Sequence, residues 1–395
     1  MLIFALGCLP CSSNQFKPVS GCDAEDINPG CQRFLNAQTN PEGFSKAHVF
    51  LNLFDMLQGT CYEQDAIAQL TSQELAKYMM TCVAVSKQAP CCGHGLMCAV
   101  PWPDFDVTGT PCQDFSPAGK HRGPLGPQMP IFLAWVQIVL AMAIPVVLHE
   151  NVPQFWVSLL EQFMGHAYFV FSIVMDCGDV GFPLISRRRR YTIMYNRSRV
   201  QVTQDPSKVY ASLCAYMART MHIAWSLSDC WLADDNEVLM EIEGLCQTRN
   251  LRAAFALHHM AMLLSPGEHR RLIAYMAMWS DRFGHCSTTD KRAVFNLADN
   301  PEADYVTWSG ASGRIPGLRT NGGKLWVPYL GRWLTTKEEV AAMGVPVYSC
   351  VAMAAGVTCV PVRPGHEAKL MLGNMMHIAS VGTAMLVALS CGQPL

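Results

Sequence analysis

Short apolar runs alternate with helix-like segments along the first half of the chain. Runs of strand length occupy 47–53, 105–107, 146–149 and 169–175. Between the first two, Thr71-Ser-Gln-Glu74 has the spacing of a helix-capping box, and apolar residues follow at helical intervals to Cys82. This alternation predicts an α/β domain with a mostly parallel sheet.

Two apolar stretches are long enough to raise the question of a membrane. Residues 129–148 carry no charge and could span a bilayer by length. Gln137 and Pro145 interrupt the stretch and Glu150 follows it, which favours a helix packed on a sheet and leading into a central parallel strand. Residues 370–391 predict a buried terminal helix, and the N-terminal run lacks the positive charge of a signal peptide. We therefore expect no stable membrane association.

Composition excludes few classes of protein. The chain has 395 residues, half of them apolar, and a net charge of −2, so any nucleic-acid footprint must be local, as in the arginine run 187–190. The 18 cysteines show no regular spacing and favour a reducing, intracellular setting. We expect the nucleus in a eukaryote and the cytoplasm otherwise.

Candidate chemistry centres on Cys112. This residue stands between a strand-like run and a polar turn, where its sulfur can act as a nucleophile if it ionises. Glu150 follows the apolar run 145–148, where burial tends to raise the pKa of a carboxyl. The arginine run then begins at the edge of another apolar segment.

These residues, in this order, resemble the DNA (cytosine-5)-methyltransferase family. The nucleophile loop Pro-Cys-Gln-x-Phe-Ser-x-Ala-Gly matches at 111–119, Glu-Asn-Val at 150–152, and Arg-x-Arg-x-Tyr at 187–191. Later matches are Arg-x-Leu-Thr-x-x-Glu at 332–338, Gly-x-Pro at 344–346 and Gly-Asn at 373–374. The resemblance implies an α/β, Rossmann-like S-adenosylmethionine-dependent methyltransferase domain with a smaller target-recognition domain. It places the N-terminal catalytic part at 1–199, the target-recognition region at 200–324 and a C-terminal return to the catalytic domain at 325–395.

The resemblance also implies roles for the matched residues. Cys112 would attack carbon 6 of a cytosine flipped out of duplex DNA, and Glu150 would contact ring nitrogen 3 and the exocyclic amine. An arginine would contact the ring carbonyl. Counting back from Tyr191 selects Arg187 and Arg189, which we prefer, whereas counting forward from Gly181-Phe-Pro183 selects Ser186 and Arg188. Ser116 and Gly119 would approach the DNA backbone.

Cofactor binding is implied at four positions. By resemblance, Asp26, with Glu25 as the alternative, would accept hydrogen bonds from the ribose, Asp55 would meet the adenine amine, and Pro111 and Asn374 would complete the pocket. The family's glycine-rich first motif is not visible, because the only glycine before position 20 is Gly7. The chain is then either truncated or degenerate at this loop.

Three expectations remain open. An active DNA methyltransferase is the first hypothesis, and a catalytically impaired DNA-binding homologue is the second. A transfer-RNA cytosine-5 methyltransferase is the third, although its Cys-Phe-Thr signature is missing.

We expect a monomer. We expect no metal site, because Cys91, Cys92, His94 and Cys98 include adjacent cysteines and no C-x-x-C pair.

Overall fold

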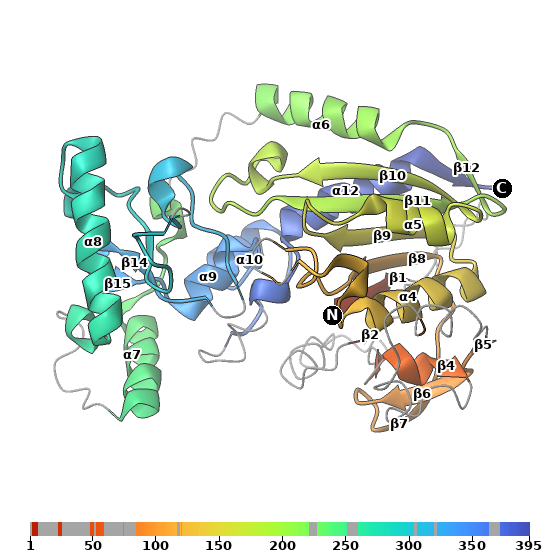
Figure 1. Ribbon diagram of the computed structural model, residues 1–395, viewed down its shortest axis with the longest axis horizontal. Coiled ribbons are helices and arrows are strands. Elements are labelled where there is room, and N and C mark those ends of the chain that lie inside the picture. Colours follow the sequence, from red (N-terminus) through yellow and green to blue (C-terminus); the bar gives the residue numbers. More distant parts are fainter. Residues whose placement is uncertain are drawn as a thin grey trace. The chain divides into compact units, whose positions relative to one another are not determined.

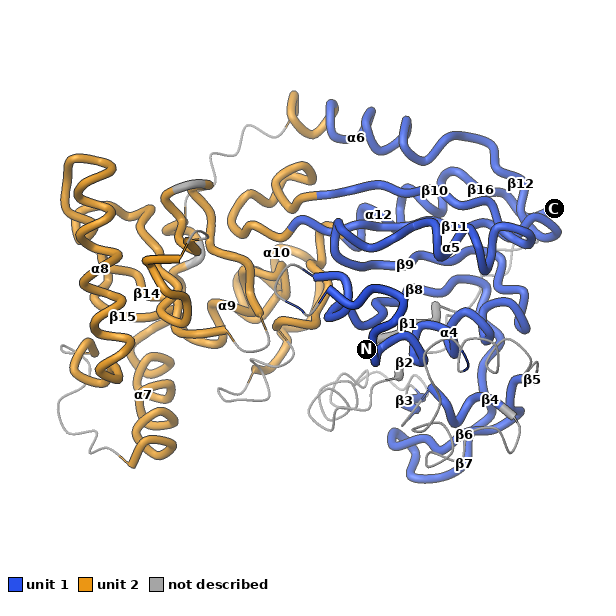
Figure 2. Tube along the Cα trace, viewed as in Figure 1, with its two compact units in different colours: residues 1–175, 188–215, 381–395 blue, residues 176–187, 216–380 orange. Residues whose placement is uncertain are grey.

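The computed structural model describes residues 2–6, 23–25, 48–50, 53–58, 74, 84–116, 119, 121–220, 227–250, 260–303, 306–319, 322–362 and 372–395 (Figure 1). The chain divides into two compact units (Figure 2). Unit 1 comprises residues 1–175, 188–215 and 381–395, and unit 2 comprises residues 176–187 and 216–380. The chain therefore leaves unit 1 twice and returns to it at its C-terminal end.

Unit 1 is an α/β unit built on one large sheet. Its elements in chain order are β1 (Leu2–Leu6), β2 (Asp23–Glu25), β3 (Val49–Phe50), η1 (Leu53–Met56), β4 (Leu57–Gln58), β5 (Ala84–Val85), β6 (Gln88–Cys91), β7 (Leu96–Ala99), β8 (Phe105–Gly109), η3 (Gly123–Leu125), α4 (Met129–Met142), β9 (Val146–Asn151), α5 (Val157–Met164), β10 (Tyr168–Met175), β11 (Arg189–Asn196), β12 (Val200–Val202) and β16 (Gly392–Pro394). Helices α6 (Pro206–Thr220) and α12 (Ile378–Cys391) each cross a boundary between the units.

The described strands of the sheet follow the order β10-β11-β9-β8-β1-β2-β3-β6-β7. The pairs β8–β9 and β2–β3 are parallel, and the other neighbours are antiparallel. The expected α/β class is confirmed, but the expectation of a mostly parallel sheet is wrong. Strands β10 and β11 follow one another in the chain and pair antiparallel, so the chain reverses its direction within residues 176–188. Apolar periodicity carries no information about strand direction.

Helices cover both faces of this sheet. Met194 of β11 packs in the cluster that contains residues of α4 and α5. The hydroxyl of the next residue, Tyr195, donates to the carbonyl of Ala388 in α12 at 2.8 Å. Since successive strand residues point to opposite faces, α4 and α5 lie on one face and α12 on the other. The fully buried Trp135 and Leu133 of α4 lie in the first of these layers.

The stretch 129–148 folds as its sequence predicts. Residues Met129–Met142 form α4, and Val146–Asn151 form β9, which pairs in parallel with β8. The other predicted strands at 105–107 and 169–175 lie within β8 and β10, and β3 covers part of 47–53. The helix predicted after Thr71 lies outside the described residues except for Glu74, which is helical.

Unit 2 combines helices with a three-stranded sheet. Its elements are η4 (Cys177–Val180), η5 (Leu227–Cys230), α7 (Asp235–Arg249), η6 (Met260–Leu263), α8 (Pro266–Phe283), η7 (Ser287–Thr289), β13 (Phe295–Asn296), η8 (Ser309–Ala311), β14 (Leu325–Val327), η9 (Pro328–Leu330), β15 (Arg332–Trp333), α9 (Thr336–Ala342) and α10 (Ser349–Ala354). Trp279 of α8 packs against Phe295 and Trp308 in an aromatic core.

Capping sequences set the helix boundaries in unit 2. The Thr335 side chain accepts from the backbone N–H of Glu338, whose carboxylate accepts from the Thr335 N–H. This capping box begins α9, and Gly344, at φ +81°, follows its end. The capping box and this glycine thus mark the two ends of α9.

Among the described residues, Leu372–Cys391 is the one helical stretch long and apolar enough to cross a membrane. Only 39% of its apolar window is buried, so it is less enclosed than the sequence predicted. Its buried side chains include Ala384, Val387 and Ala388, on the face that packs on β11. A core helix of this kind passes the same length and composition test, so the stretch is weak support for a membrane span.

Candidate active site

The loop that carries Cys112 begins directly after β8. The partly buried Cys112 is followed by a turn in which its carbonyl accepts from the N–H groups of Phe115, at 3.0 Å, and Ser116, at 2.8 Å. A Cβ placed at Gly119 would overlap the carbonyl oxygen of Gln113, so only glycine fits there. The loop therefore folds back closely on the segment that holds the cysteine.

Asp114 fixes the far side of this loop. Its buried carboxylate accepts from the backbone N–H of Gln128, one residue before α4, at 2.9 Å. The Asp114 carbonyl accepts from the N–H of Gly123. These bonds connect the cysteine loop to the start of α4.

Hydrogen bonds join the ends of β8 and β9. Gly109 lies opposite Glu150 in the parallel register. The Asn151 amide donates to the carbonyl and hydroxyl oxygens of Thr110, both at 3.1 Å, and the Thr110 hydroxyl lies 2.7 Å from His149 Nε2. The Cys112 loop and Glu150 thus emerge at the same edge of the sheet, where the carboxyl ends of parallel strands form binding sites.

Glu150 pairs with Arg189. Arg189 Nε lies 3.1 Å from Glu150 Oε1, and the two side chains are 20% and 11% exposed. Strand β11 sets this contact, because its antiparallel register with β9 places Tyr191 opposite Glu150. Arg188 is exposed. Of the two counting schemes, the one that selects Arg189 gives the arginine that meets Glu150.

The neighbouring arginines have other partners. Arg190 donates to the Pro153 carbonyl through Nε and Nη2 and to the Ser172 hydroxyl through Nη1. Arg187 is buried in unit 2, where it donates to the carbonyls of Leu318, Gly373 and Met375. These hydrogen bonds position the backbone, including the residues on both sides of Asn374.

A buried polar network under the site was missed by the sequence analysis. The Asp106 carboxylate of β8 accepts from Trp135 Nε1 at 3.0 Å and from the Thr108 hydroxyl. Burial raises the pKa of Asp106 to about 6, against the lowering effect of these hydrogen bonds. Burial also lowers the pKa of His149 to about 3, so that its imidazole is neutral at physiological pH. The sequence did contain a signal for this network, because Asp106 is a charged residue within an apolar strand.

The predicted cofactor residues are placed as follows. Asp55 is exposed in η1, directly after β3, and Pro111 is half-buried after β8. Asn374 is exposed in unit 2. Asp26 lies outside the described residues, and β2 ends at Glu25.

Strand direction tests whether these positions suit a nucleotide cofactor. Strands β2, β3, β8 and β9 all run in the same direction, so their carboxyl ends share one edge. The acids expected for the ribose and adenine thus follow strands that end at the edge of Cys112, which fits the group. Strand β1 runs the opposite way, and its carboxyl end lies at the other edge.

A helix-covered α/β sheet with its polar residues gathered at the carboxyl ends of parallel strands is a Rossmann-like arrangement. The family model of C-5 cytosine-specific DNA methylase matches residues 99–261, which contain Cys112, Glu150 and Arg189. A curated relative, the type II methyltransferase M.HgiDI of Herpetosiphon aurantiacus, is 32% identical over 103 residues, which are 25% of this chain. The match spans 33% of that relative's length. Residues 99–261 of this chain are thus similar to the cytosine-5 DNA methylase family.

Solved structures of methyltransferases also align with most of the chain. The S. pombe Dnmt2 methyltransferase is 15% identical, with 92% of this chain and 89% of that chain covered and a TM-score of 0.35. The Entamoeba histolytica methyltransferase EhMeth is 10% identical, with coverages of 91% and 94% and a TM-score of 0.41.

Proposed function

We propose that the chain methylates carbon 5 of cytosine in DNA through a covalent adduct at Cys112. The observation that carries this proposal is the arrangement of one sheet edge. The Cys112 loop follows β8, and the Glu150–Arg189 pair stands at the end of the neighbouring parallel strand β9. A nucleophile and an acid–arginine pair in adjacent positions suit attack on an amidine-like ring.

Cys112 would act first. Its thiolate adds to carbon 6 of the cytosine, forming the sulfur–carbon bond and shifting electron density toward nitrogen 3 and carbon 5. Carbon 5 thereby becomes nucleophilic. After methylation, loss of the carbon 5 proton to a base restores the double bond and expels the Cys112 sulfur, so that the enzyme is regenerated.

Glu150 and Arg189 would stabilise the charge that develops in this addition. Since the ion pair with Arg189 uses Oε1 of Glu150, Oε2 is the oxygen that would share a proton with ring nitrogen 3. Arg189 would donate to the ring carbonyl while holding the carboxylate in place. A preorganised partner of this kind contributes on the order of 10²–10³ in rate.

S-adenosylmethionine, when bound, supplies the electrophilic methyl group. Asp55 and Pro111 would contribute to holding it in unit 1, together with Asp26. Because the cytosine lies inside a duplex, the base must be flipped out to reach Cys112, and Ser116 and Gly119 would meet the backbone.

The test is transfer of tritiated methyl groups to duplex DNA and to transfer RNA. The proposal predicts label in 5-methylcytosine of DNA, and Glu150→Gln serves as the matched variant with reduced transfer. Label confined to RNA would overturn the DNA assignment. Absence of label together with absence of cofactor binding by calorimetry would favour the impaired homologue.

A further inference from the structure

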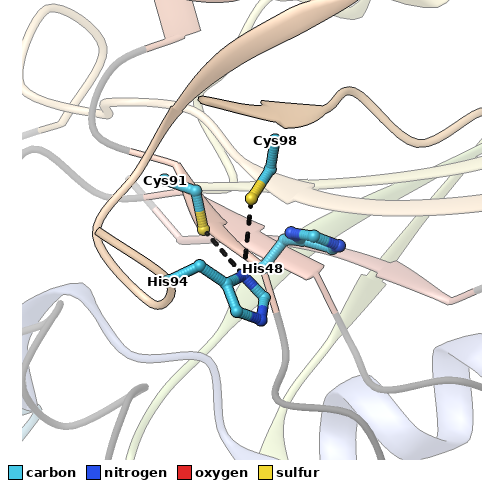
Figure 3. A group of neighbouring side chains, drawn as sticks. All are labelled: His48, Cys91, His94 and Cys98. Atoms are coloured by element: carbon cyan, nitrogen blue, oxygen red, sulfur yellow. Dashed lines mark hydrogen bonds between the residues drawn. The ribbon is translucent and has the colours of Figure 1, made fainter. Parts of the chain in front are cut away.

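Four side chains with metal-binding atoms converge at one end of the large sheet. His48, Cys91, His94 and Cys98 each offer one ligand atom, and these atoms all lie within 4.8 Å of one another. Figure 3 shows the two sulfurs directed toward the His94 ring, with His48 beside it. The group lies wholly within unit 1 and does not overlap with the Cys112 site.

Local structure explains how the chain gathers these residues. Cys91 ends β6, His94 lies in the turn, and Cys98 lies on β7 of the same hairpin. Gly95, at φ +69°, closes the turn by donating to the Cys91 carbonyl at 2.8 Å. His48 directly precedes the neighbouring strand β3, which pairs with β6 through Phe50 and Cys91.

The separations match those of a tetrahedral ion site. Both Cys91 Sγ and Cys98 Sγ lie 3.5 Å from His94 Nδ1. Metal–ligand lengths of about 2.3 Å to sulfur and 2.0–2.1 Å to nitrogen place two tetrahedral ligands about 3.6 Å apart. A neutral ring nitrogen has one lone pair, so it cannot accept well from two thiols at once. A shared cation accounts for both contacts.

A further bond holds the Cys91 sulfur in place. The backbone N–H of Val49 donates to Cys91 Sγ at 3.3 Å, and a bond of this kind orients and tunes a metal ligand. The adjacent Cys92 is different, because its thiol donates to the Val49 carbonyl at 3.1 Å. Cys92 is therefore outside the ligand set, although it is next in sequence.

We propose that His48, Cys91, His94 and Cys98 bind a structural zinc ion. Two thiolates and two imidazoles are a ligand set that zinc prefers, and four protein ligands leave no open position for catalysis. On binding, each thiol releases its proton to solvent. This inference reverses the expectation of no metal site and is independent of the proposed function.

The residues around the site indicate which strands a zinc ion would stabilise. Among the residues that the structure describes, the buried apolar cluster here consists of Phe50, Ala89, Cys91 and Cys98, which is small for stabilising the last two strands of the sheet. The same hairpin region is joined to η1 through the bond from Ser86 N–H to the Met56 carbonyl, at 2.7 Å. Zinc would thus fasten β3, β6 and β7 together and hold the helical turn that carries Asp55.

The experiment measures zinc in the purified full-length chain by mass spectrometry of the metal. The proposal predicts about one ion per chain, and loss of most of it in Cys98→Ser and His94→Ala. Cys92→Ser is the matched control and should retain the ion. Replacement by cobalt should give the intense visible bands of a tetrahedral thiolate site in the wild-type chain and in Cys92→Ser.

A second measurement remains informative if the ligand variants do not fold. Zinc should protect Cys91 and Cys98 of the wild-type chain from alkylation, and a chelator should expose both, as read by peptide mass spectrometry. The proposal is overturned if the wild-type chain holds no zinc, if these two cysteines form a disulfide, or if they alkylate equally with and without chelator.

Discussion

Asp106→Asn should change how the stability of the protein depends on pH. Asp106 is only 3% exposed and lies on β8, the strand that leads to Cys112. Burial raises the pKa of Asp106 from 3.8 to about 6 in the folded protein. The folded state therefore binds a proton more tightly than the unfolded state does.

Proton linkage gives the sign and the size of the change in the free energy of unfolding with pH. Between pH 3.8 and about 6, the folded state holds the proton on Asp106 and the unfolded state does not. The free energy of unfolding should therefore fall as pH rises through this window and stay low above it. A difference of roughly 2 pKa units corresponds to about 3 kcal/mol. An asparagine side chain cannot ionise, so the variant lacks this contribution.

Urea unfolding of both proteins at a series of pH values measures the effect. The stability of the wild type relative to Asp106→Asn should decrease by about 2 kcal/mol from pH 4 to pH 7. His149 acts with the opposite sign, because its lowered pKa removes stability as pH falls below 6.5. It is present in both proteins, so the comparison isolates Asp106. The reasoning would be refuted if the stability of the wild type relative to Asp106→Asn were independent of pH, or if it rose from pH 4 to pH 7.

Three further predictions concern substitutions at the site. Glu150→Gln should lower single-turnover methyl transfer on the order of 10²-fold while DNA affinity changes less than about twofold, and an equal fall in both would make Glu150 structural. Arg189→Ala should reduce the same rate about as strongly, whereas the exposed Arg188→Ala should not; equal rates in the two variants would contradict the Glu150 pairing. Arg187→Met should lower the free energy of unfolding by about 3 kcal/mol in denaturant titration, because three backbone carbonyls lose their donor, and an unchanged stability would count against its positioning role.

Local sequence signals predicted much of the fold. The uncharged stretch 129–148 became α4 and β9, because apolar runs act over a few residues. The antiparallel placement of β1 and β11 was not predicted. Strand order depends on pairing between distant segments, which a local pattern does not encode.

The same distinction applies to the site residues. The motifs indicated Cys112 and Glu150, but only the register of β9 with β11 identifies Arg189 as the partner of Glu150. The cysteine–histidine group shows most clearly what a local sequence pattern does not predict. His94 stands three residues after Cys91 and four before Cys98, a spacing typical of zinc ligands, yet the fourth member, His48, is 43 residues before Cys91. Only strand pairing brings it there.

Covalent trapping tests the central claim most directly. Duplex DNA substituted throughout with 5-fluorocytosine, incubated with the protein and S-adenosylmethionine, cannot lose the carbon 5 substituent, so the sulfur remains attached to carbon 6. We expect an adduct that survives denaturation, maps to Cys112 by peptide mass spectrometry and is lost in Cys112→Ala. An adduct that persists in Cys112→Ala, or that forms on another cysteine, would contradict this expectation.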